Sequence, residues 1–348
     1  MSSLSRGARA AGREAPGRSP DVPRVAYRVT VHEGPVVRVV PDQRRRPRAR
    51  GGVVAACGVV VVACAVGVWL LWRAFVETWA GQRVEDAALD GAAFGQGRLW
   101  AVAEPVLDVV SVGFVAGGLL GAAVVALVRR RLSLAVQVAV LVGGANLTTR
   151  VVKHAVLDRP LLGVGADYGN TLPSGHTTAA GSVAAALLLV APPRARPVVA
   201  VLGAGYTALT GVSTLVGQWH RPSDVVAGTL VVLGWTALVC GAMAARPGVA
   251  PTATSTLPRV GAGDPWWQRT RRTALGLAVL GAAAGAVAGV LLARTWAYRA
   301  GVAGRGHELL AYGGGVAGVV AACCLTFAAM LVLRHAAGSR DETTSAPG

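Results

Sequence analysis

Eight long apolar stretches, none of which contains a charged residue, divide this 348-residue chain. Most of them reach the roughly 20 residues that an α-helix needs to cross the hydrocarbon core of a bilayer. The shortest reaches that length if its helix starts at Pro173. Backbone groups in lipid must form their hydrogen bonds inside the chain, and a helix does so within one segment. The stretches occupy residues 51–72, 109–128, 132–149, 177–193, 197–219, 225–245, 273–293 and 309–333.

Charge is scarce outside a few clusters, which argues against a water-soluble helical protein. Charged residues make up 15% of the chain, whereas a soluble domain carries about a quarter. We therefore predict an all-α integral membrane protein with eight spans. Six of the spans form a transmembrane core, and the last two form an added C-terminal hairpin.

The first 50 residues carry almost half of the excess positive charge. They hold twelve arginines against four acidic residues and are rich in proline and glycine, a composition that cannot bury a core. A basic segment that ends at a membrane span is typical of a cytoplasmic arm that contacts anionic lipids. RNA binding by this tail is the alternative, but the charge distribution favours the membrane, and we expect no nucleic-acid partner.

Arginine clusters between the apolar stretches predict the orientation of the chain. They lie at residues 44–50, 129–131, 194–196 and 269–272. Because positive residues favour the cytoplasmic side, we expect both termini and these connections in the cytoplasm of a multi-pass cell-membrane protein. The remaining loops, 73–108, 150–176, 220–224 and 294–308, then face outward.

The same boundaries predict the domain organisation. The segments are a disordered basic cytoplasmic tail at 1–50, a six-helix core at 51–245, a cytoplasmic linker at 246–272, a transmembrane hairpin at 273–335 and a cytoplasmic tail at 336–348. All five cysteines lie inside apolar stretches without metal-ligand spacing. We interpret them as packing residues and expect neither a metal site nor a cofactor.

Three polar clusters fall in the loops predicted to face outward. They are KHAVLDRP at 153–160, PSGH at 173–176 and STLVGQWHRPSD at 213–224. The first contains Lys153, the single lysine among 34 Lys and Arg residues. The distribution of arginines alone places all three clusters on the same side of the membrane, without reference to their chemistry. This shared location indicates that they form one functional site.

The residue types in these clusters suit phosphoryl transfer. His220 and Asp224 are four residues apart, and a carboxylate beside an imidazole fixes its tautomer and supports nucleophilic attack by the other nitrogen. The free N–H groups of a helix that starts near Pro173 would hold an anion, with Gly175 permitting close approach. His176 would then deliver a proton. Lys153 and Arg159 add positive charge for phosphate oxygens.

These clusters resemble the three signature motifs of the type 2 phosphatidic acid phosphatase (PAP2) family, which is related to vanadium-dependent haloperoxidases. The family pattern is Lys-x6-Arg-Pro, then Pro-Ser-Gly-His, then Ser-Arg-x5-His-x3-Asp, and the resemblance covers about residues 51–245. It implies a metal-independent membrane phosphatase that hydrolyses a phosphatidic acid-type lipid or a polyprenyl diphosphate through a phosphohistidine at the outer face. The implied site residues are His220, Asp224 and His176 for catalysis and Lys153, Arg159, Ser174 and Gly175 for phosphate binding.

The chain departs from the family pattern at two positions. Five residues rather than six separate Lys153 from Arg159, and Thr214 stands where the family has an arginine. Arg150, one helical turn before Lys153, and Arg221, beside His220, are the candidates to replace the missing cation, so Thr214, Arg150 and Arg221 remain tentative phosphate-binding residues. The alternative function is a catalytically silent relative that binds or moves lipids.

Overall fold

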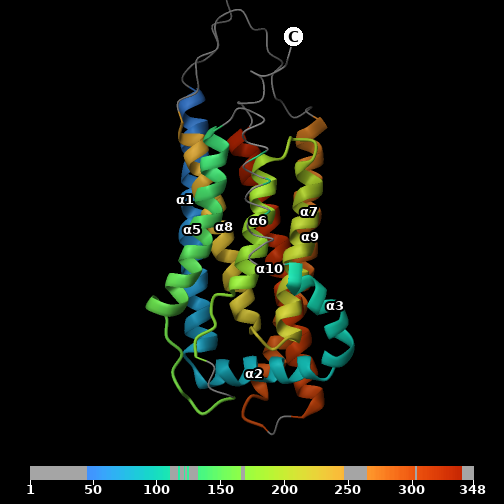
Figure 1. The fold of residues 1–348 in the computed structure, drawn as a ribbon. Coiled ribbons are helices and arrows are strands. Elements are labelled where there is room, and N and C mark those ends of the chain that lie inside the picture. Colours follow the sequence, from blue (N-terminus) through green and yellow to red (C-terminus); the bar gives the residue numbers. More distant parts are fainter. Residues whose placement is uncertain are drawn as a thin grey trace, which may run out of the picture. The chain divides into compact units, whose positions relative to one another are not determined.

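A computed structural model of the chain describes residues 45–109, 132–165, 169–246, 265–301 and 304–338, and the single positions 117, 121 and 124. In these residues every regular element is a helix (Figure 1). The α-helices are α1 (Arg45–Leu71), α2 (Trp79–Ala93), α3 (Gln96–Val109), α5 (Leu132–Val151), α6 (Gly175–Val190), α7 (Arg196–Val216), α8 (Pro222–Ala245), α9 (Pro265–Ala297) and α10 (Arg305–Gly338). Two π-helical turns, η1 (Trp72–Val76) and η2 (Val152–Val156), continue α1 and α5.

Within the described residues, six helical segments are long and apolar enough to cross a membrane, which confirms the predicted all-α integral membrane class. They are Gly51–Val76, Leu132–Val156, Arg196–Val216, Pro222–Ala245, Trp266–Ala297 and Arg305–Gly338. The predicted span at 177–193 corresponds to α6, whose 16 residues extend only about 24 Å at 1.5 Å per residue. The predicted span at 109–128 lies outside the described residues, apart from Val109 and the three single positions.

Helices α1 and α9 both begin before the apolar stretches at 51–72 and 273–293. Helix α1 begins at Arg45, six residues before the predicted edge of the core, and α9 begins at Pro265 within the predicted linker. Arginine side chains at a helix end extend toward water while their stems stay on apolar surface, so charge did not mark where these helices start. Residues 1–44, 247–264 and 339–348 lie outside the described part of the chain.

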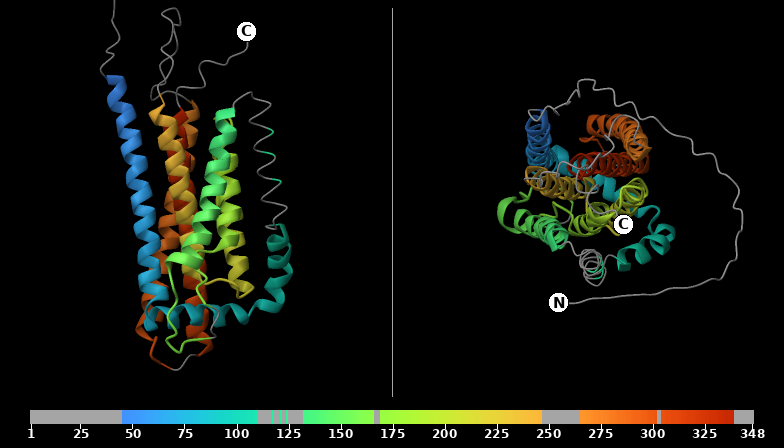
Figure 2. Two further views of the ribbon diagram at one scale, coloured as in Figure 1. Left: turned by 60° about the vertical axis from the view of Figure 1, so that its left-hand side comes forward. Right: turned by 90° about the horizontal axis from the view of Figure 1, so that it is seen from above.

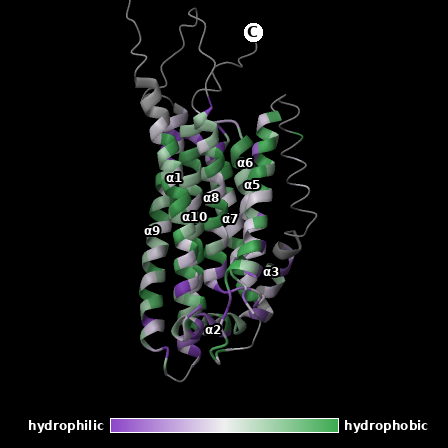
Figure 3. Ribbon diagram, turned by 90° about the vertical axis from the view of Figure 1, so that its left-hand side faces the viewer, coloured by the Kyte–Doolittle hydropathy of each residue, from purple (hydrophilic) through white to green (hydrophobic). Residues whose placement is uncertain are grey.

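The long helices lie side by side, and α2 crosses one end of the bundle, between α1 and α3 (Figures 1 and 2). Hydrophilic residues gather around α2, and hydrophobic residues extend along the helices (Figure 3). The arginines at 194–196 and 269–272 belong to the opposite end. Helix α10 packs against α2, α7 and α8 as well as α9, so the C-terminal helix pair is part of the same bundle.

Polar contacts between helices join α5, α6 and α8. The hydroxyl groups of Thr149 on α5 and Thr178 on α6 are 3.0 Å apart, and the indole N–H of Trp235 on α8 donates to Thr148 Oγ1 at 3.0 Å. In an apolar surrounding such bonds stabilise helix association by about 1 kcal/mol. Helices α5, α6 and α8 are thereby held in register at the end of the bundle that carries the polar clusters.

Candidate functional site

The N-terminus of α6 is joined directly to the first turn of α8. The backbone N–H of Ser174 donates to the backbone carbonyl of Asp224 at 2.8 Å. Ser174 is also the N-cap of α6, because its side-chain oxygen accepts from the N–H of Thr177 at 3.3 Å. A Cβ added to Gly228 would lie 3.0 Å from the carbonyl oxygen of Ser174, so this close approach requires glycine.

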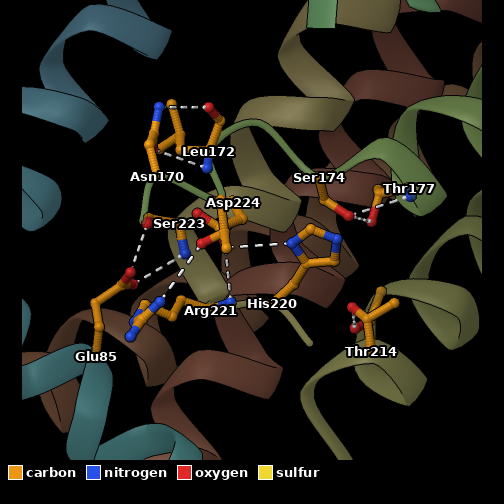
Figure 4. A network of polar contacts seen from close by, with 12 residues as sticks. Glu85, Asn170, Leu172, Ser174, Thr177, Thr214, His220, Arg221, Ser223 and Asp224 are labelled. Atoms are coloured by element: carbon orange, nitrogen blue, oxygen red, sulfur yellow. Dashed lines mark hydrogen bonds and ion pairs between the residues drawn. The ribbon is translucent and has the colours of Figure 1, made fainter. Parts of the chain in front are cut away.

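His220 and Asp224 form a buried pair (Figure 4). Nδ1 of His220 lies 3.4 Å from Oδ2 of Asp224, and the side chains are 7% and 1% exposed. The same carboxylate oxygen accepts the backbone N–H of Arg221 at 2.9 Å. The His220 backbone N–H donates to the carbonyl of Thr214 at 3.3 Å, which fixes the loop between α7 and α8. The backbone N–H of Arg221 therefore helps to hold the Asp224 carboxylate in the orientation that faces the imidazole.

His176, in the first turn of α6, faces His220 across the site. The centroids of the two rings are 5.8 Å apart, and the ring of Trp219 lies 5.3 Å from that of His176. At Gly175 a Cβ would meet no atom within 4 Å. The start of α6 thus borders open space beside both imidazoles, a position where backbone N–H groups favour an anion.

Three cationic side chains surround this pair of histidines. Lys153, in η2, is half-buried and within electrostatic range of Asp224 and His176. Burial lowers the pKa of Arg159, and the neighbouring charge of Arg221 lowers it further. Nη2 of Arg159 and Nε of Arg221 are buried and have no hydrogen-bond partner in the described part of the chain. Buried unpaired guanidinium nitrogens are costly and would be satisfied by phosphate oxygens.

The three tentative phosphate-binding residues occupy different surroundings. Arg221 lies in the network, 2% exposed, with Nη1 donating to Thr171 Oγ1 at 3.4 Å. Thr214 is fully buried in α7, and its hydroxyl donates to the carbonyl of Gly211 in its own helix at 2.7 Å. Arg150 is exposed on α5. Of these three residues, only Arg221 offers a positive charge within the network around Asp224.

Two residues that sequence reasoning missed complete the site. The side-chain amide of Asn170 donates to the carbonyl groups of Leu157 and Leu172, at 2.6 and 3.2 Å, and holds the loop between η2 and α6. Glu85 of α2 accepts two hydrogen bonds from Ser223, 138 positions along the chain. No motif in the sequence marks Glu85, which lies in the loop 73–108 that was predicted only to face outward.

A hollow of about 540 Å³ lies beside Trp219. Gln96, Gly97, Trp100, Gly217 and Trp219 line it, and the rings of Trp100 and Trp219 are 6.0 Å apart. Trp219, one wall of this hollow, also lies against the ring of His176. These lining residues are aromatic or neutral and suit an uncharged group.

Comparison with known proteins gives one family. Residues 135–246 match the family described as the PAP2 superfamily. No curated protein and no solved structure matches the chain. The matched segment includes all three polar clusters. It begins after α2, which carries Glu85, and ends before α9.

Proposed function

Because residues 135–246 carry the PAP2-superfamily domain, which supports a phosphatase-type function, we propose that this chain is a membrane lipid-phosphate phosphatase. It acts through a phosphohistidine intermediate at the outer face of the membrane. The observation that carries the proposal is the His220–Asp224 pair facing His176, with the unpaired guanidinium nitrogens of Arg159 and Arg221 nearby.

The first half-reaction transfers the phosphoryl group to His220. Its Nδ1 faces Asp224, which leaves Nε2 free to attack phosphorus. As the N–P bond forms, the bond between phosphorus and the ester oxygen breaks, and protonated His176 gives its proton to that oxygen. The alcohol leaves as a neutral molecule, and the Asp224 carboxylate stabilises the cationic imidazole that remains.

The second half-reaction releases inorganic phosphate. Neutral His176 accepts a proton from water while the water oxygen attacks phosphorus, and the N–P bond breaks with its electron pair returning to Nε2. Lys153, Arg159, Arg221 and the N–H groups at the start of α6 stabilise the charge on the phosphoryl oxygens in both halves. Protein cations thus carry the charge in these steps, so we expect turnover to be unaffected by EDTA.

The surroundings of the site favour a lipid substrate at the outer surface. The site lies at one end of an apolar bundle, and the arginines at 194–196 and 269–272 lie at the other, which the positive-inside rule assigns to the cytoplasm. Trp219, one wall of the hollow, lies against His176, the residue proposed to protonate the leaving group. A phosphatidic acid-type lipid has an uncharged glycerolipid leaving group that suits these walls. A polyprenyl diphosphate is the second substrate candidate.

A catalytically silent lipid-binding protein is the alternative, favoured by the neutral Thr214 in the third motif. Purified full-length protein in detergent, supplied with dioctanoyl phosphatidic acid, separates the two functions. The enzyme releases inorganic phosphate and its His220→Ala variant does not. Binding of the lipid without phosphate release by the native protein would establish the alternative.

A further inference from the structure

Glu85 connects the helix that crosses the site end to the first turn of α8 (Figure 4). Its carboxylate accepts the backbone N–H of Ser223 at 3.0 Å and the hydroxyl of Ser223 at 2.6 Å. The residue is 2% exposed. The second distance is in the short range typical of a hydroxyl that donates to an ionised carboxylate. Ser223 immediately precedes Asp224, so this contact holds the turn that carries the orienting carboxylate.

The charged neighbours of Glu85 belong to the same site. Asp224 repels its ionised form, and Arg221 attracts it; Arg159 is also within electrostatic range. Asp86 and Arg83 are the flanking charged residues on α2, and His307, Glu308 and Tyr312 are titratable residues on the outer part of α10, which packs along α2. Glu85 therefore lies between the acidic residue that orients His220 and the arginines proposed to bind phosphate.

We propose that Glu85 is a positioning residue of the phosphatase site: it fixes the first turn of α8 through Ser223, and its charge controls how strongly Arg221 holds the substrate phosphate. This inference rests on the proposed function. Glu85 lies outside residues 135–246, so the family match does not include it. It acts through Ser223 and Arg221 and has no assigned contact with the reacting atoms.

The charge of Glu85 changes within the physiological pH range. Burial and, to a smaller extent, the Asp224 carboxylate raise the pKa of Glu85 to about 7, against the lowering effects of the Ser223 hydrogen bonds and of Arg221. Below this pKa a neutral Glu85 leaves the positive charge of Arg221 available to the phosphate. Above it, the ionised carboxylate attracts Arg221 and repels the phosphate, so anion affinity falls as pH rises.

Glu85→Gln separates charge from shape. A glutamine has nearly the same size, its carbonyl oxygen still accepts the Ser223 N–H, and its NH2 group donates to the Ser223 hydroxyl. We expect its KM for dioctanoyl phosphatidic acid, and its Kd for inorganic phosphate by calorimetry, to match those of the native protein near pH 6. Near pH 8 both constants should be lower than the native values by roughly threefold to tenfold, with little change in kcat.

The comparison is made between variants at each pH, because phosphate itself titrates in this range. Asp90→Asn is the matched control: Asp90 is an exposed carboxylate on the same helix, and its removal should leave the pH dependence unchanged. Ser223→Ala is the second test, because loss of the hydroxyl donor should raise the pKa of Glu85 and shift the fall in affinity to higher pH. Thermal melting checks that each variant is folded.

The outcomes separate this inference from the proposed function. Constants for folded Glu85→Gln that follow the native values from about pH 6 to about pH 8 would overturn the charge effect. If the native protein releases no phosphate from the lipid, the proposed phosphatase function is wrong. The Kd for inorganic phosphate still tests whether the charge of Glu85 controls anion binding. A similar kcat loss in Glu85→Gln and Glu85→Ala at every pH, with KM unchanged, would show that Glu85 has only a structural role. That result would contradict the proposal.

Discussion

The backbone N–H of Ser174 donates a hydrogen bond to the backbone carbonyl of Asp224, at 2.8 Å. This bond joins the residue that caps α6 to the residue that orients His220. The distance between His176 and His220 therefore depends on how closely the first turns of α6 and α8 approach each other. This backbone contact holds together the two segments that carry the histidines.

Gly228→Ala tests that dependence. The new Cβ would lie 3.0 Å from the carbonyl of Ser174, so the two helix starts must separate by a few tenths of an ångström. We expect kcat to fall by about tenfold or more, with a moderate loss of stability. Gly143→Ala on α5 is the control, because its Cβ would meet no atom within 4 Å. Equal kcat values for the two variants would contradict the proposed role of this contact.

His176→Ala should show a dependence on the leaving group. Hydrolysis of dioctanoyl phosphatidic acid should slow by about 10²–10⁴-fold, the usual contribution of a general acid. p-Nitrophenyl phosphate needs little protonation of its leaving oxygen, so its cleavage should slow much less. Initial rates on both substrates check this prediction. Equal losses on the two would show that His176 does not act as the acid.

The cation that replaces the family arginine should be Arg221. Arg221→Ala removes a buried guanidinium and should raise KM for the lipid and Kd for inorganic phosphate by about tenfold. Arg150→Ala, which changes an exposed side chain, should leave both constants within about twofold of the native values. A strong effect at Arg150 with none at Arg221 would reverse the assignment.

Thr214→Arg should be harmful, although it restores the family residue. Thr214 is fully buried, and its hydroxyl is bonded to Gly211 within α7. A much larger side chain there overpacks the helix interface, at a cost of about 1–3 kcal/mol. We expect a lower melting temperature and no gain in kcat/KM, measured beside Thr214→Ser as the small control. A more active and equally stable arginine variant would disprove this prediction.

Cysteine labelling in intact cells tests the orientation. Leu161→Cys lies on the site end and is 75% exposed as leucine, and Ser133→Cys lies exposed at the start of α5, next to the predicted cytoplasmic cluster at 129–131. Gly165 is a poor labelling position because its φ is positive and a side chain would collide with Asp86. In a background without native cysteines, an impermeant thiol reagent should modify position 161 and spare position 133. The reverse pattern would place the site in the cytoplasm.

The sequence predicted the helical class and the three polar clusters because each depends on local information. Long uncharged stretches predict membrane-spanning helices. Each polar cluster holds its histidine, carboxylate or cationic residues within a short segment, so it can be recognised in the sequence. The length of α6 was overestimated, since hydropathy does not show that its helix starts at the Ser174 cap and ends at Val190. Helix starts at Arg45 and Pro265 were missed for a related reason: arginine is compatible with a helix end.

The contacts that organise the site could not be predicted from a single sequence. Glu85 meets Ser223 only because α2 lies across the end of the bundle, and no periodicity predicts where such a helix docks. The choice between Arg150 and Arg221 likewise required knowing which side chain is buried. Asn170 belongs to no motif, and only its hydrogen bonds to the surrounding backbone distinguish it from other loop residues.

Trapping of the covalent intermediate tests whether His220 is the nucleophile. Full-length protein is mixed with dioctanoyl [³²P]phosphatidic acid, quenched in alkali, which preserves a phosphohistidine, and digested so that the labelled peptide can be sequenced. We expect alkali-stable, acid-labile label on His220 in the native protein and none in His220→Ala. Phosphate release by the native protein without label on His220, or equal label in the His220→Ala variant, would contradict that role of His220.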